Sequence, residues 1–374
     1  MIRNYFHRRN LTVSDKILSL DFKLFFLVLL LGIISFFAMY STEQGKFDYY
    51  TKNHIYRFVA FFIIFIFISF INIRHLYKSA YIFYILALLL LIGVGLFGIT
   101  ASGSTRWINL FFINLQPSEL MKIALIVFLS RYYNRIPSRD VNSIKFMIRP
   151  FFAISIPVYL VVIQPDLGTA ILIASGGLAI IWLAGLRMKY FIYSFIALIC
   201  IAPVVIAFLK PYQKMRILTF FNPERDPLGS GYQLIQSKIA IGSGGFIGKG
   251  FLQGSQSYLD YLPEKHTDFI FTLFSEEFGF VGSTLLLIIY AMIIQRIVSI
   301  GNLAKSNFSK LYCYGFATAF FFYVAVNMSM VLGLLPIVGA PLPIMSYGGS
   351  AMLSMMIGLG IVMSCKVYNQ EIVT

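Results

Sequence analysis

The chain has 374 residues, of which 59% are hydrophobic and only 12% are charged. Ordinary soluble domains carry roughly 25% charged residues, so a soluble fold is excluded for most of this sequence. The net charge of +15 suggests nucleic acid, but the basic residues lie in short segments between apolar runs, which is typical of a membrane protein. The three cysteines are scattered without metal-ligand spacing, which argues against a disulfide framework or a zinc site.

Ten apolar runs follow the polar, basic segment 1–21, which shows no signal-peptide cleavage site. A helix needs about 20 apolar residues to cross a bilayer. The sequence therefore predicts an all-α integral membrane protein with about ten transmembrane helices, built as one polytopic domain over residues 1–374. The predicted spans are Phe22–Tyr40, Tyr56–Ile71, Ser79–Ile99, Pro117–Tyr132, Pro150–Ile163, Leu167–Leu186, Tyr190–Leu209, Phe269–Gln295, Leu311–Leu335 and Gly349–Tyr368.

The distribution of Lys and Arg predicts the orientation of these spans. If the N-terminus is inside, the inside segments hold 17 Lys and Arg residues and the short outside loops hold 4. An excess of basic residues on the cytoplasmic side is the rule for membrane proteins. Both termini are therefore expected in the cytoplasm.

One long polar segment, residues 210–267, separates the seventh and eighth predicted spans, and this topology places it outside. Loops of this length are usually functional or disordered, and the Gly, Ile and Leu content of this one favours order with short interfacial helices. Its basic residues break the usual charge bias, so we expect an anionic partner. They are Lys210, Lys214, Arg216, Arg225, Lys238, Lys249 and Lys265.

Charged groups at the edges of spans are candidates for function, because they are costly in a membrane. Glu119 and Lys122 open the fourth span three residues apart, as either a structural ion pair or substrate contacts. Asp166, in the tight outer turn before the sixth span, either caps that helix or contacts substrate. Arg106 and Trp107 lie in an outer loop, where a Trp is usually an interfacial belt residue.

The end of the long loop holds Glu264, His266 and Asp268, at the mouth of the eighth span. We expect Asp268 at a helix N-terminus, where its carboxylate can accept a proton from a sugar hydroxyl while Lys and Arg stabilise a phosphate leaving group. The alternative is an N-cap aspartate without a chemical role. Glu276 and Glu277 do not share one helix face with Asp268, so a paired-carboxylate glycosidase is not supported.

Motifs of several other enzyme classes do not occur in the sequence, which has no Walker loop, HExxH, GxSxG or CxxC. The glycine-rich stretch 242–250 is a weak nucleotide motif, because no parallel strand is expected before it.

Several sequence blocks resemble the SEDS family (shape, elongation, division and sporulation), and within it the RodA branch more than the FtsW branch. The blocks span most of the chain in family order, which makes the resemblance specific. They are Gln116–Lys122, Gln164–Thr169, Asn222–Gln233, Gln236–Gly250, Leu262–Phe271 and Gly339–Ser350.

The resemblance implies a ten-span peptidoglycan glycosyltransferase of the bacterial plasma (inner) membrane. Such enzymes polymerise lipid II outside that membrane during cell elongation and rod-shape maintenance. It also implies that Asp268 matches the family's essential aspartate, and that Glu119, Lys122 and Asp166 match residues of its outer cavity. The implied partners are lipid II, a class B penicillin-binding protein that crosslinks the strands, the elongation machinery and membrane lipid, without nucleic acid.

In the resulting hypothesis, Asp268 is the catalytic base that deprotonates the acceptor's 4-hydroxyl, which attacks the donor's anomeric carbon with inversion. Lys249, Lys238, Arg216 and Lys122 are candidates to hold the leaving pyrophosphate. A divalent cation sharing that role stays open, although the sequence shows no metal cage and implies no other cofactor. The expected substrate contacts are Glu119, Lys122, Asp166, Trp107, Arg106, Arg216, Lys238, Lys249, Glu264 and His266.

Two alternatives from other functional classes remain. A flippase that moves lipid II across the membrane would use charged groups within a span, such as Glu119 and Lys122, as a polar path. Such a protein needs a site that is accessible from both sides, whereas the candidate groups gather on the outer side. A scaffold that only docks the penicillin-binding protein is the other alternative.

Overall fold

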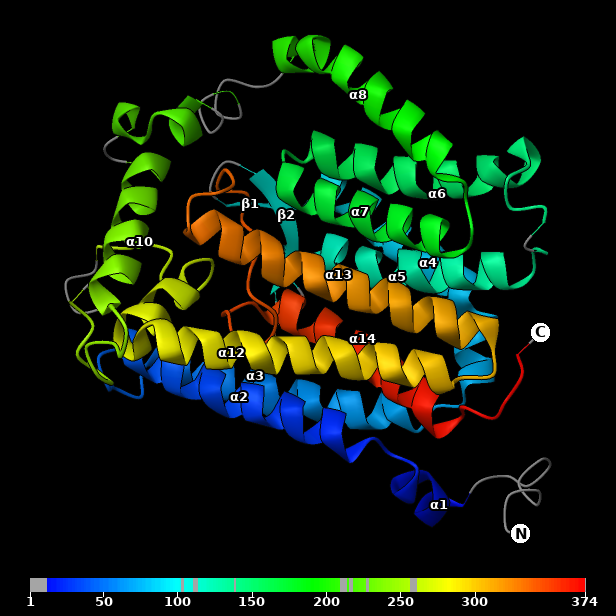
Figure 1. Ribbon diagram of the computed structural model, residues 1–374, viewed down its shortest axis with the longest axis horizontal. Coiled ribbons are helices and arrows are strands. Elements are labelled where there is room, and N and C mark those ends of the chain that lie inside the picture. Colours follow the sequence, from blue (N-terminus) through cyan, green and yellow to red (C-terminus); the bar gives the residue numbers. More distant parts are fainter. Residues whose placement is uncertain are drawn as a thin grey trace.

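The structure is a computed structural model that describes residues 12–101, 104–109, 114–137, 139–208, 214, 218–226, 229–255 and 261–373. Long helices that run side by side dominate it (Figure 1). Within the described residues, ten helices have 17 residues or more. They are α2 (Phe22–Thr42), α3 (Tyr49–Ser69), α4 (Ile73–Phe97), α5 (Pro117–Asn134), α6 (Ile144–Ile163), α7 (Leu167–Leu183), α8 (Met188–Phe208), α12 (Ile270–Leu303), α13 (Asn307–Val331) and α14 (Gly349–Val367).

Each predicted span overlaps one of these helices, and the chain is a mostly helical, multi-pass membrane protein. Seven of the helices, α2, α3, α4, α6, α12, α13 and α14, are long and apolar enough to cross a bilayer. By contrast, α5 carries Glu119, Lys122 and Arg131 within 18 residues, and α7 has only 17 residues. The count of ten crossings therefore stays a prediction.

The outer surface of the bundle is apolar, as the side chains of α2 illustrate. Phe26, Leu30 and Phe37 recur at helical spacing and are exposed, whereas Leu24 and Leu31 are fully buried. A surface helix of a soluble protein exposes polar residues instead. This exposed apolar face is therefore suited to contact with the hydrocarbon of a lipid bilayer.

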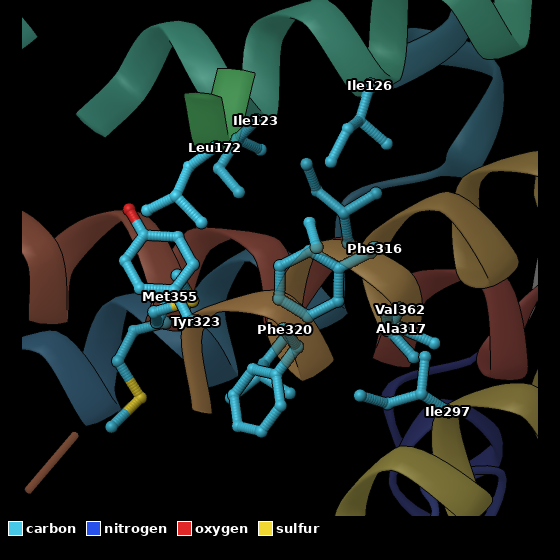
Figure 2. Close-up of a cluster of buried hydrophobic side chains, with 14 of the residues drawn as sticks. Ile123, Ile126, Leu172, Ile297, Phe316, Ala317, Phe320, Tyr323, Met355 and Val362 are labelled. Carbon is cyan, nitrogen blue, oxygen red and sulfur yellow. The ribbon is translucent and has the colours of Figure 1, made fainter. Parts of the chain in front are cut away.

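At the centre of the bundle lies α5, which contacts α4, α7, α13 and α14. Fourteen of its 18 residues are buried. Figure 2 shows Ile123 and Ile126 of α5 in one buried cluster with Phe316, Phe320 and Tyr323 of α13. This packing fixes α5 on all sides, so its polar side chains occupy defined positions inside the bundle.

A small antiparallel sheet stands where the sequence analysis expected only an outer loop. Its strands, in spatial order, are β1 (Ile99–Ala101), β2 (Ser104–Asn109) and β3 (Asn114–Leu115). Ile99 pairs with Trp107 across the first two strands. β1 and β3 have only three and two residues, and the six residues of β2 do not alternate between apolar and polar, so no pattern reveals the strands. The sheet gives Arg106 and Trp107 a fixed backbone beside the bundle.

The segment between α8 and α12 is folded onto the bundle over much of its described part. It contains the 3-10 turn η1 (Pro223–Arg225) and α10 (Ser230–Gly244). The Ser237 hydroxyl of α10 lies 2.8 Å from Thr272 Oγ1 of α12 and donates to the Val331 carbonyl of α13 at 2.7 Å. These bonds tie α10 to two helices at once.

A kink interrupts α12 at Gly279, whose φ of 62° lies in the left-handed region. A β-carbon at this position would lie 2.3 Å from the backbone nitrogen of Gly248, so both the backbone angle and the close approach require glycine. The backbone N–H of Lys249 donates to the Glu276 carbonyl at 3.0 Å. The kink therefore lets the glycine-rich segment dock against α12.

Candidate functional site

A cavity of about 570 Å³ opens between the end of the long loop, the small sheet and residues 337–351. This is the left end of the bundle in Figure 1, where β1 and β2 lie. Among the sequence-predicted site residues, four line the cavity: Arg106, Trp107, Glu264 and Asp268. The cavity therefore brings together the candidates from two segments that are far apart in the sequence.

Asp268 lies two residues before α12 begins, and its partly exposed side chain lines the cavity. Phe269 is the N-cap residue of α12, so Asp268 lies one residue before the N-cap position that the alternative assigned to it. A β-carbon at Gly339 would lie 3.6 Å from Asp268 Oδ2, which shows how closely the loop after α13 approaches the carboxylate.

Asn327 of α13 holds the backbone around Asp268 in place. Its Nδ2 donates to the Asp268 carbonyl at 2.9 Å and to the Ala340 carbonyl at 2.7 Å, and the side chain is fully buried. One amide therefore links the aspartate to the loop that faces it. Asn327 was not predicted as a site residue, although a buried amide in an apolar span is a signal of such a role.

His266 contacts α2 and α3 and is not among the residues that line the cavity. Its Nδ1 lies 2.8 Å from Thr42 Oγ1, and its ring stacks on Tyr50 at 4.0 Å between centroids. The Tyr347 backbone N–H donates to its carbonyl at 2.8 Å. These contacts make His266 an anchor of the loop end, two residues from Asp268.

Asp166 joins two cavity-lining side chains from behind. Its carboxylate accepts from the backbone N–H of Thr169, which confirms that it caps α7. Oδ2 also accepts from Gln116 Nε2 at 3.2 Å and lies 3.5 Å from Arg106 Nε. Arg106 Nη2 donates to the Pro165 carbonyl at 2.8 Å. Because Asp166 is 2% exposed and does not line the cavity, its contacts orient Gln116 and Arg106.

The predicted ion pair of α5 is present and is almost sealed from solvent. Lys122 Nζ lies 2.7 Å from Glu119 Oε1, and the two residues are 4% and 2% exposed. Tyr323 donates to Glu119 Oε2 at 2.6 Å, and Lys122 Nζ lies 4.1 Å from the Tyr323 ring centroid. Ser354 lies 3.4 Å from the same carboxylate oxygen. The pair therefore binds α5 to α13 and α14 and does not line the cavity.

Lys249 is engaged by a carboxylate of α12. Its Nζ lies 2.6 Å from Glu276 Oε1, and the Ser255 N–H and hydroxyl donate to the same oxygen at 3.0 and 2.8 Å. On the neighbouring residue, Glu277 accepts from Ser41 of α2. Glu276 thus fastens the glycine-rich segment to α12, whereas Glu277 links α12 to α2.

The remaining predicted contacts lie in different places. The exposed side chain of Lys238 runs over Gly333, where an added β-carbon would meet Lys238 Cε at 2.2 Å. Glu264 is exposed at the cavity rim and accepts from Thr267 Oγ1 at 2.8 Å. Arg216 lies outside the described residues.

Arg57 is a cavity residue that the sequence analysis counted only as a loop charge. It projects from α3 into the cavity wall, and its guanidinium carbon lies 4.5 Å from the centroid of Tyr347. Burial raises the pKa of Tyr347 to about 12, against the opposing effect of Arg57, so its hydroxyl stays protonated at neutral pH. Arg57 and Arg106 are the arginines of this wall.

Within the described part of the chain, no three His, Cys, Asp or Glu side chains gather in a way that holds a metal ion.

Comparison with known proteins identifies the family. Residues 18–371 match the model of the FtsW, RodA and SpoVE family, which is described as a cell cycle protein. The chain belongs to this family. The resemblance predicted from the sequence blocks is thus confirmed over nearly the whole chain.

Relatives of this family member carry names that describe an activity. The peptidoglycan glycosyltransferase MrdB of Escherichia coli (strain K12) is 43% identical over 77% of each chain. The probable peptidoglycan glycosyltransferase FtsW of Wigglesworthia glossinidia brevipalpis is 36% identical over 93% of each chain. Stage V sporulation protein E of Bacillus subtilis (strain 168) is 36% identical over 77% of each chain.

Solved structures confirm the FtsW/RodA/SpoVE fold. A chain from a peptidoglycan synthase complex, studied for the coordination of polymerization and crosslinking, superposes with a TM-score of 0.81 at 29% identity. The match covers 94% of this chain and 99% of that one. The rod shape determining protein RodA of Thermus thermophilus gives a TM-score of 0.72 at 25% identity, covering 95% and 99%.

Proposed function

We propose that this chain is a peptidoglycan glycosyltransferase that polymerises lipid II into glycan strands during cell elongation. The family membership and the 43% identity to MrdB support the reaction class. The observation that carries the proposal is the cavity of about 570 Å³. Asp268, Arg57 and Arg106 all line this one cavity. A base and two fixed cations are what transfer from a pyrophosphate donor requires.

In the proposed mechanism, Asp268 acts as the general base. It takes the proton of the acceptor's 4-hydroxyl, and the resulting oxygen forms a bond to the donor's anomeric carbon. The bond between that carbon and the pyrophosphate oxygen breaks, and the electron pair leaves with the pyrophosphate. Attack from the opposite side inverts the anomeric centre. Asn327 fixes the backbone of the base and excludes other positions for it.

Arg57 and Arg106 are the proposed holders of the leaving pyrophosphate. Both line the cavity with Asp268, and guanidinium groups bind phosphate oxygens through paired hydrogen bonds. Lys249 and Lys122 are less suited, because each is bound to a carboxylate at 2.6 and 2.7 Å. A lipid-linked donor also explains why this cavity lies at one end of a membrane bundle.

The same proposal assigns an orientation and a location. The excess of Lys and Arg in the inside segments, 17 against 4 in the short outside loops, supports cytoplasmic termini and a cavity that faces the extracytoplasmic side of the inner membrane. The solved neighbour from a complex of polymerization and crosslinking supports a class B penicillin-binding protein as the partner.

The experiment that tests this function uses the full chain in detergent with its cognate penicillin-binding protein, lipid II and a β-lactam that blocks crosslinking. The expected result is a ladder of glycan strands on a gel. Detergent micelles have no two leaflets, so a flippase would form no polymer there. Absence of polymer with the partner demonstrably bound would therefore contradict the enzyme and favour the flippase.

A further inference from the structure

A second polar pocket lies at the other end of α2 from the Asp268 cavity. It has a volume of about 320 Å³, and its charged lining residues are Asp21, Lys23, Arg296 and Lys366. The 21 residues of α2 span about 31 Å at about 1.5 Å per residue. The hydrocarbon core of a bilayer is about 30 Å thick, so the pocket and the cavity lie at opposite membrane surfaces.

The pocket has more positive than negative charge. Its one carboxylate, Asp21, is bound by Arg296 at 2.9, 2.9 and 2.6 Å, and burial leaves Asp21 only 3% exposed. Among the ion pairs of the described residues, none includes Lys23 or Lys366. The charges of Asp21 and Arg296 offset each other, so Lys23 and Lys366 give the pocket a net positive charge.

The short helix α1 (Val13–Leu18) lies beside this pocket and exposes apolar side chains, which is the opposite of a surface helix in a soluble protein. Val13, Ile17 and Leu18 are 70%, 44% and 78% exposed. Its basic side chain points the other way, because Lys16 Nζ lies 3.5 Å from the Phe70 carbonyl and 5.7 Å from the Tyr368 ring centroid. An apolar outer face on a helix at a membrane surface is typical of insertion into the headgroup region.

We propose that this pocket binds the phosphate of an anionic phospholipid headgroup, with α1 inserted in the same leaflet. Lys23 and Lys366 supply the charge, while Phe22 and Leu18 at the pocket's edge contact the upper acyl chain. The combination of cations with exposed apolar side chains distinguishes a lipid from a soluble phosphate, which would gain nothing from the apolar contacts. Basic pockets at the cytoplasmic ends of spans suit anionic headgroups.

Lipid retention by the full chain tests this site directly. Native mass spectrometry from non-ionic detergent would measure binding of phosphatidylglycerol and of phosphatidylcholine. The expected result is tighter binding of phosphatidylglycerol. Each of Lys23→Gln and Lys366→Gln should weaken it about fivefold, as the loss of one basic contact near an anionic surface predicts. A double variant of Lys78→Gln and Lys145→Gln, which removes two exposed lysines elsewhere, should retain wild-type binding.

Two further arms make the source of the phosphate distinguishable. Val13→Ser with Leu18→Ser should weaken phosphatidylglycerol binding, and soluble glycerol phosphate should not displace the lipid. Equal binding of the two lipids, equal losses in the Lys23→Gln or Lys366→Gln variant and in the Lys78→Gln, Lys145→Gln control, or displacement by glycerol phosphate would each overturn the proposal.

Discussion

The ion pair of Glu119 and Lys122 and the cavity around Asp268 both place charged side chains in an apolar bundle, but their surroundings differ. The pair in α5 is almost fully buried, and Tyr323 and Ser354 complete its contacts. Asp268 is partly exposed and lines an open space with Arg57. The comparison teaches that charges in one bundle can have different surroundings: one group is sealed between helices and holds them together, and the other faces a cavity that is open to a ligand.

Removal of one partner from the α5 pair should give the largest effect on stability. Lys122→Met leaves the Glu119 carboxylate buried without its cation, which costs about 3–5 kcal/mol of unfolding free energy. Unfolding in detergent measures this loss. Arg139→Met, at the exposed pair with Asp140, should cost less than about 0.5 kcal/mol. Similar losses at the two sites would remove the distinction between a buried structural pair and a surface pair.

Asn327→Leu should lower the unfolding free energy by about 1–3 kcal/mol, because the Asp268 and Ala340 carbonyls lose their donor. It should also reduce glycan synthesis by the folded fraction, since the backbone of the base is no longer fixed. Asn53→Leu is the control, because that amide bonds only locally to the Tyr49 carbonyl. Unchanged activity in Asn327→Leu would show that the cavity tolerates movement of this loop.

Arg57→Gln should lower kcat/KM for polymerisation about tenfold, which corresponds to about 1.4 kcal/mol of transition-state stabilisation. Arg57→Lys should restore part of the rate by returning a charge without the planar fork. Lys52→Gln, at an exposed cation five residues earlier on α3, serves as the matched control. If the Arg57 and Lys52 variants lower kcat/KM equally, Arg57 contributes only to the overall positive charge of the surface and not to the cavity.

The Asp21–Arg296 pair is intermediate in burial between the α5 pair and the cavity, because Asp21 is buried and Arg296 is partly exposed. Its loss should have the smallest effect on the unfolding free energy. Burial opposes ionisation of Asp21, but the hydrogen bonds and charge of Arg296 prevail and lower the pKa of its carboxyl. The pair's contribution, about 1 kcal/mol, is therefore complete above the unfolded-state pKa of about 3.9 and is lost as pH falls through the lowered folded-state value. In Asp21→Asn, this loss of unfolding free energy at low pH should disappear. If the variant loses the same unfolding free energy at low pH as the wild type, that loss belongs to other carboxylates.

Hydropathy predicted the helices because apolar runs of membrane length have few other solutions. Each predicted span overlaps a helix, and the cap at Asp166 and the pair of Glu119 with Lys122 followed from local spacing. The sheet of β1, β2 and β3 was missed, because β1 and β3 have three residues or fewer and β2 does not alternate between apolar and polar residues.

Long-range contacts were beyond the sequence. The partner of Lys249 is Glu276, 27 positions away, and no local pattern predicts that they meet. Arg57 was missed as a cavity residue for the same reason, because only the folded bundle brings α3 beside Asp268. Which cations remain available to a ligand is decided by tertiary contacts.

The most direct test of the account is the initial rate of glycan formation by Asp268→Asn, measured per folded molecule with the unfolding midpoint of the same sample. The account predicts a wild-type midpoint and a rate lower by about 10²–10⁴, the usual contribution of a general base. Asp140→Asn, at a partly exposed aspartate in the segment between α5 and α6, should keep the wild-type rate. A wild-type rate in Asp268→Asn would contradict the account.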